Sequence, residues 1–318
     1  MKEEEVINLS NKFNFNPVEV FPLKLEASGR EYWRIINESK ETAVLCYLDP
    51  KIDDHSNFIN ISNELKKNNI RGVEIFYHNK EDGVTIQEDL GDEDLISIFN
   101  DNNKKELLEM SLELLVDIQE SEIANLEEFS KKDLINQMSL FNEIFCQKFL
   151  NIKSDDSIND LIEITIDKLY EHPWVNCHFD FERRNLVLKD NNQLIVIDYQ
   201  DMKRGPIGID LAGILADHYF EADISNIKSF LNFYSTKINS KYSNDECFEF
   251  TRWGCIQRNL RILGTLSNLF LVKNRSFRLK DMPLILKNLI TMIPNEHSSK
   301  IFLEKNIEPL LLETIEQL

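Results

Sequence analysis

Five side chains between residues 176 and 212 have types and spacing suited to phosphate chemistry. They are His178, Asp180, Asn185, Asp198 and Asp210. Carboxylate and amide oxygens bind a hard cation that keeps some water and also holds phosphate oxygens, as magnesium does when it carries ATP. A further carboxylate can accept a proton from an attacking hydroxyl. The stretch therefore predicts a site for phosphoryl transfer.

A hairpin is expected to bring three of these residues together. Residues 186–188 and 194–197 are short apolar runs separated by a polar turn, which is typical of two antiparallel strands. Asp180 and Asn185 precede the first run, and Asp198 follows the second. We therefore expect all three side chains at one end of the hairpin, in one pocket between two lobes and close enough to share a divalent ion.

Three elements in this order resemble the aminoglycoside phosphotransferase family, which comprises small-molecule kinases with a protein-kinase-like fold. They are His-x-Asp-x-x-x-x-Asn, an apolar run ending in Ile-Asp-Tyr, and Gly-Pro-x-x-x-Asp-Leu-Ala. The resemblance implies ATP and Mg²⁺ as cofactors. It implies that Asp180 is the catalytic base, Asn185 and Asp198 bind the metal, and His178 and Asp210 support the loop. The alternative is that these Asp and Asn residues only cap turns and that His178 only bonds to backbone.

The resemblance implies an α+β, bilobal protein-kinase-like fold, with a small antiparallel sheet followed by a larger helical part. Residues 1–91 are expected to form a nucleotide-binding lobe, with a small antiparallel sheet and the hinge, and residues 92–318 a helical lobe with the catalytic loop and substrate pocket. In the first lobe we expect a short N-terminal helix, a helix over 55–68 and several strands. The strands are predicted between Leu23 and Ile36, over 42–50, over 73–77 and over 84–87.

After Gly91 the apolar residues recur at i, i+3 and i+4, which is typical of amphipathic helices. The predicted helices cover residues 94–100, 104–121, 132–152, 157–171, 209–220 and the remaining chain over 224–318, and a strand is predicted over 174–177. This strand is expected to deliver His178.

The nucleotide side departs from the usual kinase pattern. The third strand of such kinases carries a lysine for the phosphates, whereas the corresponding run here ends in Cys46. One branch of the family, which phosphorylates the anomeric hydroxyl of N-acetylmuramate and N-acetylglucosamine, also lacks this lysine, and the run from Gly29 to Arg34 is similar to that branch. The resemblance implies a nucleotide site made of Ser28, Gly29, Arg30, Arg34 and, at the hinge, Glu88 and Leu90. Arg30 or Arg34 would replace the lysine, unless both are solvated strand residues.

Three arginines are candidates for substrate binding. Arg258 and Arg261 are three residues apart and share a face of a predicted helix over 251–274. Their segment, Gln-Arg-x-Leu-x-x-Leu-Gly, resembles the anomeric sugar kinases, so one of them would face the substrate, at a lactyl carboxylate for instance. Arg184, beside Asn185, is the third candidate. The alternative is that these arginines pair with surface acids.

Composition limits the range of partners. The 318 residues carry a net charge of −19, which argues against general binding to nucleic acid or to an anionic membrane. ATP is repelled too, so a local basic patch is required. Five scattered cysteines without a C-x-x-C pair suggest a reducing cytosol, and we see no signal peptide and no apolar run of membrane-spanning length. We expect a cytoplasmic monomer whose partners are a sugar and ATP.

These features together predict a sugar kinase, an enzyme that transfers phosphate to an alcohol group. The favoured acceptor is the anomeric hydroxyl of N-acetylmuramate or N-acetylglucosamine, in cell-wall recycling. One alternative is an aminoglycoside, choline or amino-acid kinase of the same fold. Another is a catalytically silent nucleotide-binding protein, which the absent lysine would favour and the intact set of Asp180, Asn185 and Asp198 would not.

Overall fold

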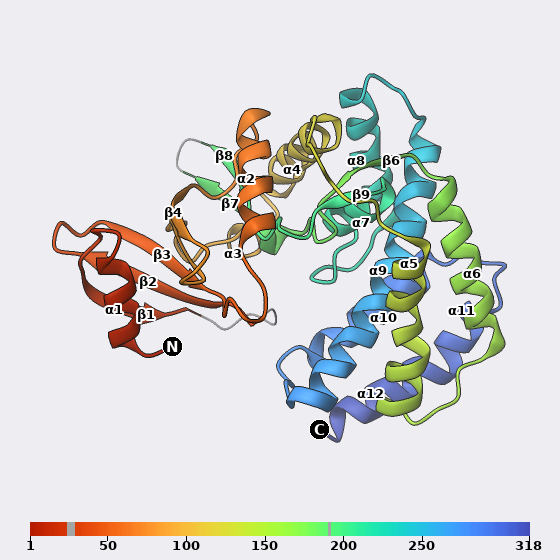
Figure 1. Ribbon diagram of the computed structural model, residues 1–318. Coiled ribbons are helices and arrows are strands. Elements are labelled where there is room, and N and C mark those ends of the chain that lie inside the picture. Colours follow the sequence, from red (N-terminus) through yellow and green to blue (C-terminus); the bar gives the residue numbers. More distant parts are fainter. Residues whose placement is uncertain (24–28, 190–191) are drawn as a thin grey trace. The chain divides into compact units, whose positions relative to one another are not determined.

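The computed structural model describes residues 1–23, 29–189 and 192–318. The chain forms two compact units, whose elements are labelled in Figure 1. The first unit contains Met1–Ile98, Ser121–Ala124 and Arg184–Asp201, and the second contains Phe99–Glu120, Asn125–Arg183 and Met202–Leu318.

The first unit is built on a five-stranded antiparallel sheet with strand order β1-β2-β3-β5-β4. Its elements are α1 (Glu3–Asn11), β1 (Pro17–Pro22), β2 (Glu31–Asn37), β3 (Thr42–Tyr47), α2 (Ser56–Lys67), β4 (Ile75–Asn79), β5 (Val84–Glu88) and α3 (Leu95–Ile98). The N-terminal helix, the second helix and the hairpin of β4 and β5 confirm the predictions. The first strand was expected from Leu23 but begins at Pro17, and most of its residues are half-buried or exposed, so it lacks a strong apolar pattern.

The two faces of this sheet differ in chemistry. One face carries a hydrophobic core that includes Val6 of α1, and Figure 1 shows α1 lying over β1, β2 and β3. Its other members are Trp33, Ile35, Ala43, Leu45, Val84 and Ile86. Because side chains alternate along a strand, the residues between them point to the opposite face. Tyr32, Cys46 and Thr85 lie in register there, so this face is polar.

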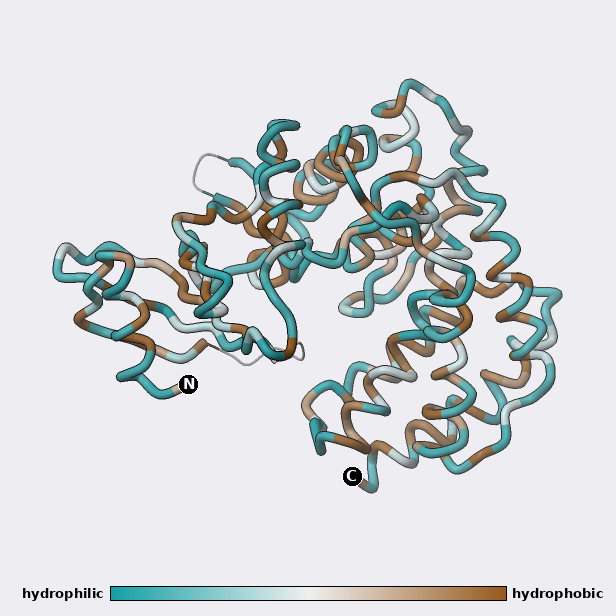
Figure 2. Tube along the Cα trace, viewed as in Figure 1, coloured by the Kyte–Doolittle hydropathy of each residue, from teal (hydrophilic) through white to brown (hydrophobic). Residues whose placement is uncertain are grey.

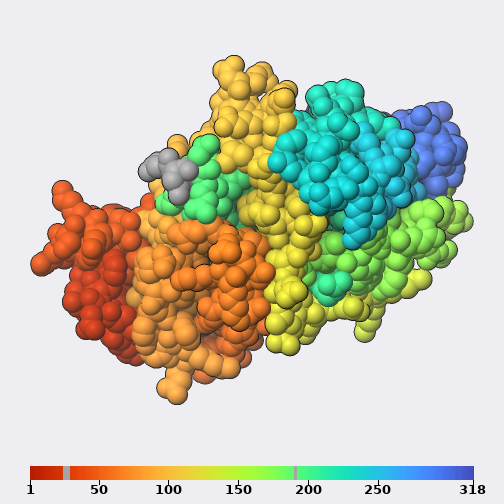
Figure 3. All heavy atoms as spheres, turned by 90° about the horizontal axis from the view of Figure 1, so that it is seen from above, coloured from red at the N-terminus to blue at the C-terminus, as the bar shows by residue number. Residues whose placement is uncertain are grey.

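A second hairpin belongs to the first unit although it lies far along the sequence. β7 (Leu186–Lys189) pairs with β8 (Gln193–Val196), which confirms the predicted strands. The Val196 N–H donates to the Arg71 carbonyl at 3.0 Å, and Val196 bridges Gly72. In Figure 3 this hairpin, in green, lies beside the orange segment of the same unit.

The second unit is mainly helical. Its helices are α4 (Lys104–Glu120), α5 (Lys131–Leu140), η1 (Phe141–Phe149), α6 (Asp156–Glu171), α7 (Gly208–Leu215), α8 (Ile224–Lys237), α9 (Asn244–Lys273), η3 (Leu279–Asp281), α10 (Met282–Met292), α11 (Ser299–Phe302), η4 (Leu303–Ile307) and α12 (Glu308–Glu316), and its strands are β6 (Trp174–Cys177) and β9 (Lys203–Pro206). Figure 2 shows hydrophobic and hydrophilic residues alternating along these helices. The predicted antiparallel sheet followed by a helical remainder is confirmed.

Helix α9 packs closely on α7 in the second unit. A Cβ at Gly254 would lie 2.0 Å from the Gly208 carbonyl oxygen, so the two backbones approach closely only because both residues lack a side chain. This contact fixes the side chains that α9 carries relative to the start of α7.

Among the helices of the described residues, none combines the length and the apolar character that a membrane-spanning segment requires.

Candidate active site

The loop that follows β6 is held by a buried carboxylate. Asp210, in the first turn of α7, accepts the His178 N–H at 2.6 Å and the Phe179 N–H at 2.8 Å. Burial raises the pKa of Asp210, although His178 and Arg258 act in the opposite direction. Asp210 thus holds the loop backbone by two hydrogen bonds, and its role in supporting a catalytic loop stays a prediction.

The loop itself has an unusual backbone conformation. Phe179 has a φ of +68°, which is rare for a residue with a side chain. The Asp180 N–H donates to Nδ1 of His178 at 3.3 Å, and His178 is buried. Conformations of this kind persist where surrounding contacts enforce them, and they occur often at functional sites.

Asp180 is paired with both of the predicted arginines. Its Oδ1 lies 2.8 Å from Nη2 of Arg261 and 3.4 Å from Nη1 of Arg258. Burial opposes ionisation of this carboxyl, but the two guanidinium groups outweigh it and hold the pKa of Asp180 well below its usual range. The Asp180 side chain is 46% exposed, so a charged carboxylate is accessible to solvent.

The two arginines differ in how much solvent they meet. Arg261 is 21% exposed, whereas Arg258 is 3% exposed. Arg258 also donates to the Phe179 carbonyl at 2.6 Å and to Glu182 at 3.1 Å. Burial would lower the pKa of Arg258, but Asp180, Glu182 and Asp210 together raise it. Arg261 is thus the solvent-accessible cation beside Asp180, and Arg258 is a buried cation.

The two predicted metal ligands, Asn185 and Asp198, both belong to the first unit. The Ile197 N–H donates to the Asn185 carbonyl at 3.0 Å, which extends the hairpin by one step and places Asp198 beside it. Asn185 is buried, while Asp198 is exposed and has a φ of +62°. Asp180 belongs to the second unit. The shared pocket of all three residues stays a prediction.

The donor set fits magnesium carried by a nucleotide. One amide oxygen and one carboxylate are hard ligands, and Mg²⁺ is usually bound through few carboxylates, with phosphates and water completing its shell. Within the described part of the chain, no three His, Cys, Asp or Glu side chains gather to hold a metal alone. Phosphate oxygens and water would complete the shell of a metal at Asn185 and Asp198.

The polar face of the sheet carries Arg34 of β2 and Cys46 of β3. Cys46 stands there, and burial raises the pKa of its thiol to about 12, so it supplies no charge. Arg30 acts electrostatically on Tyr32 and on Cys46. Arg34 is bound to Asp89 at 2.7 Å and to Asp92 at 2.9 Å. Arg34 thus has two carboxylate partners, and the roles of Arg30 and Arg34 at the phosphates stay predictions.

The other residues predicted to bind nucleotide or substrate lie in the first unit, except for one that the structure does not describe. Ser28 lies outside the described residues. Gly29 has a φ of +80°, a conformation that glycine adopts readily. Glu88 pairs with Arg71 at 2.7 Å, and Leu90 is half-buried. Arg184 is exposed.

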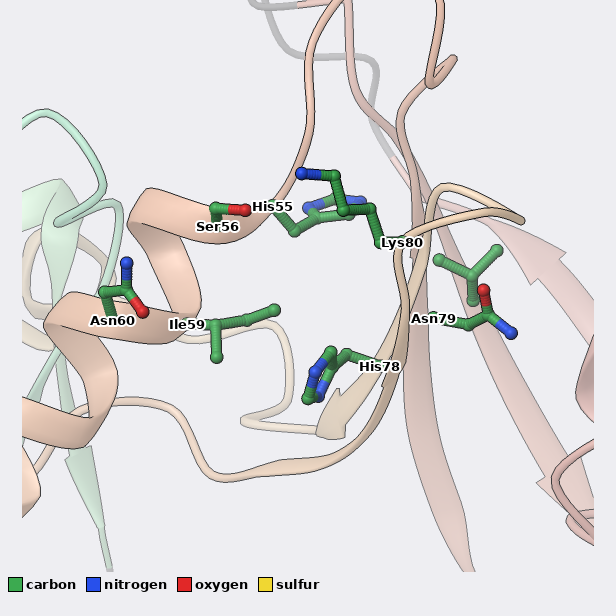
Figure 4. Close-up of a pocket in the computed structure, with 8 residues that line it drawn as sticks. His55, Ser56, Ile59, Asn60, His78, Asn79 and Lys80 are labelled. Carbon is green, nitrogen blue, oxygen red and sulfur yellow. The ribbon is translucent and has the colours of Figure 1, made fainter.

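The described residues also line two cavities, one in each unit. The first, of about 190 Å³, lies between the start of α2, with His55 and Ile59, and the end of β4, with His78 and Lys80 (Figure 4). The second, of about 440 Å³, is lined by Arg183 and by residues of α4 and α8. None of the predicted catalytic, metal or nucleotide residues lines either cavity.

Sequence reasoning missed the acids that partner the arginines. Glu182 lies within the catalytic motif, two residues after Asp180, but its pairing with Arg258 spans 76 residues. Asp89, within the predicted hinge, and Asp92, just after it, bind Arg34. The available signal was composition, because a mostly apolar helix with two arginines requires anionic partners.

The family model described as "Phosphotransferase enzyme family" matches residues 20–243. An N-acetylmuramate/N-acetylglucosamine kinase from Neisseria meningitidis serogroup B is 27% identical over 202 residues. The match spans 59% of this chain and 60% of that relative.

Solved structures of kinases share the fold. Choline kinase LicA from Streptococcus pneumoniae has a TM-score of 0.63 at 14% identity, with 91% of this chain and 99% of that chain covered. The ADP-bound aminoglycoside phosphotransferase APH(2'')-Ib has a TM-score of 0.59 at 14% identity, with 92% and 99% covered. At these identities the likeness concerns the fold alone.

Proposed function

The chain belongs to the phosphotransferase enzyme family, and on this premise we propose that it is an ATP- and magnesium-dependent kinase of the anomeric hydroxyl of an amino sugar. The observation that carries the proposal is the pairing of a partly exposed Asp180 with Arg261 and Arg258. N-acetylmuramate and N-acetylglucosamine are the proposed acceptors, in cell-wall recycling in the cytoplasm. The similarity to the Neisseria kinase supports this choice.

In the proposed reaction Asp180 orients the sugar hydroxyl and accepts its proton as the γ-phosphate is transferred. Asn185 and Asp198 would hold Mg²⁺, whose charge stabilises the phosphates of ATP. Gly29, Arg30 and Arg34, with Ser28, would bind these phosphates, and the backbone from Glu88 to Leu90 would receive the adenine.

The charge beside Asp180 distinguishes between acceptor classes. Choline and aminoglycosides are cations, whereas N-acetylmuramate carries a carboxylate. An accessible guanidinium 2.8 Å from the base repels a cationic acceptor and can bind an anionic one. We therefore place Arg261 at the lactyl carboxylate, with Arg184 as a second candidate, although the fold is shared with choline and aminoglycoside kinases.

An ADP-release screen tests the proposal. The panel contains N-acetylmuramate, N-acetylglucosamine, kanamycin and choline, and phosphorus NMR of the product identifies the oxygen that is phosphorylated. We expect turnover of the amino sugars, an anomeric phosphate, and a loss of about 10²- to 10⁴-fold in kcat for Asp180→Asn because the general base is removed. Asp160→Asn, an exposed position on α6, is the matched control.

Two results would reject the proposal. Turnover of choline or kanamycin without turnover of either amino sugar would assign a different acceptor. Magnesium-dependent nucleotide binding without ADP release from any acceptor would indicate a catalytically silent protein.

The assignment of Arg261 has its own test. Arg261→Gln should raise KM for N-acetylmuramate by about 10- to 100-fold, the value of a charged hydrogen bond, and should leave KM for N-acetylglucosamine nearly unchanged. Arg261→Lys keeps the charge and should recover part of the affinity. An equal rise for both sugars would show that Arg261 does not read the carboxylate.

A further inference from the structure

We propose that Glu182 is a positioning residue that fixes Arg258 and, through it, the backbone next to Asp180. The inference deepens the proposed function and rests on it, because Asp180 needs an exact position only if the chain transfers phosphate. Glu182 itself does not touch the reacting atoms in this proposal.

Glu182 is a buried carboxylate with partners on two sides. It is 3% exposed. Its Oε2 accepts Nη2 of Arg258 at 3.1 Å, and its Oε1 accepts the Tyr219 hydroxyl at 3.3 Å. His218 Nδ1 lies 3.6 Å from Oε2. A carboxylate held in this way has a fixed position and can fix the guanidinium it binds.

Arg258 divides its two terminal nitrogens between the loop and Glu182. Nη1 donates to the Phe179 carbonyl at 2.6 Å, and Nη2 donates to Glu182. Since the guanidinium is planar and is bound at both nitrogens, it cannot rotate without breaking one of these bonds. Glu182 therefore determines where the Arg258 donor meets the loop.

The loop depends on this donor because its backbone is strained. Phe179 has a φ of +68°; Asp210 binds its N–H and Arg258 binds its carbonyl. α7 approaches the loop closely at Gly213 because glycine has no Cβ. A Cβ there would lie 2.5 Å from the Phe181 carbonyl oxygen and 3.4 Å from Cζ of Arg258. Loss of the Arg258 donor would allow the peptide after Phe179 to turn, and Asp180 would turn with it.

Glu182 also balances charge at the base. Arg261 and Arg258 both lower the proton affinity of Asp180, and a general base with a very low proton affinity is inefficient. Arg258 binds both Glu182 and Asp180, and because Glu182 holds it, its guanidinium lies 3.4 Å from Asp180. The guanidinium of Arg261 lies closer, at 2.8 Å. Without Glu182 we expect Arg258 to move onto Asp180.

Glu182→Gln tests the proposal because it keeps the shape and removes the charge. We expect kcat to fall by about 10- to 100-fold, as for a displaced catalytic group, with KM for ATP unchanged. Glu304→Gln, an exposed position on η4, is the matched control and should keep wild-type activity. Equal kcat in the two variants would overturn the proposal.

A double mutant shows whether Glu182 acts through Arg258. If it does, Glu182→Gln combined with Arg258→Met should be no slower than Arg258→Met alone, because the group that Glu182 positions is already gone. Losses in kcat that multiply would show that Glu182 acts independently, which would reject the assigned role.

Hydrogen exchange gives a readout that does not need an acceptor. The peptide covering residues 176–183 should exchange faster in Glu182→Gln than in Glu304→Gln, whereas the peptides of α9 should exchange at equal rates. If the wild type transfers phosphate to none of the acceptors, the proposed function fails while this comparison still decides the positioning role. Unchanged exchange over 176–183 would reject it.

Discussion

Arg34 in the first unit and Arg258 in the second are each bound by two carboxylates, in different surroundings. The Arg34 side chain is 18% exposed, and its partner Asp92 is 77% exposed. Arg258 and its partner Glu182 are 3% and 4% exposed. Solvent can replace Asp92 as a partner of Arg34, whereas the ion pair of Arg258 and Glu182 is closed to solvent.

This difference indicates two uses of the same side chain. A guanidinium at the surface can exchange a carboxylate for a phosphate at little cost, since water screens both states. A buried guanidinium is fixed because any unpaired charge left behind is costly. The first unit therefore holds a positive charge at Arg34 that can change partner, and the second unit holds a fixed one at Arg258 that supports the loop around Asp180.

The largest expected effect on stability is that of Arg258→Met. It leaves Glu182 buried without its cation, which should cost about 3 to 5 kcal/mol of the free energy of unfolding. Denaturant titration at pH 7 measures this loss, and Arg252→Met, on a more exposed part of α9, is the control. A loss of less than about 1 kcal/mol would place Arg258 in the same class as a surface arginine.

Acidification should weaken the second unit through His172. Burial lowers the pKa of His172 to about 4, from an ordinary value of 6.5. Between these pH values the unfolded chain binds the proton and the folded one does not, so stability is full above pH 6.5 and falls as the pH drops toward 4. The shift corresponds to a loss on the order of 3 kcal/mol.

Denaturant titrations from pH 7 to pH 4 measure this loss. His172→Leu removes the titrating group and should flatten the pH dependence over that window. An unchanged slope in His172→Leu would assign the pH dependence to other groups.

Local patterns could be predicted from the sequence, and long-range pairings could not. The hairpin of β7 and β8 and the motif around Asp180 follow from residues a few positions apart. The bridge from Val196 to Gly72, which places that hairpin in the first unit, joins positions far apart in the chain, and no periodicity reports it. The same holds for Glu182 and Arg258.

Some local features could not be predicted from the sequence either. The predicted helix over 132–152 is confirmed as helical, but Phe141–Phe149 is a π-helix. Its apolar spacing is satisfied by an α-helix as well, so hydrophobic periodicity does not distinguish the two. The first strand was predicted to begin at Leu23, after the end of β1, because the mostly exposed residues of β1 show no alternation of apolar and polar side chains.

Arg34→Gln should have a smaller effect than either change in the second unit. We expect a loss of about 1 kcal/mol in the free energy of unfolding, because Asp89 keeps its bond from the Gly91 N–H at 3.0 Å and Asp92 is in water. The loss should shrink further in 1 M salt, which screens exposed pairs. KM for ATP should rise if Arg34 exchanges Asp92 for phosphate, and an unchanged KM would leave Arg30 as the phosphate ligand.

The smallest expected effect on stability is that of Asp92→Asn. This variant is the counterpart of Glu182→Gln, because the first removes the charge of a carboxylate bound to Arg34 and the second removes the charge of a carboxylate bound to Arg258. Asp92 is exposed, so its removal should change the free energy of unfolding by less than about 0.5 kcal/mol. It should also lower KM for ATP slightly, since Arg34 loses a competitor for phosphate. A cost as large as that of Glu182→Gln would show that exposure does not separate the two arginines.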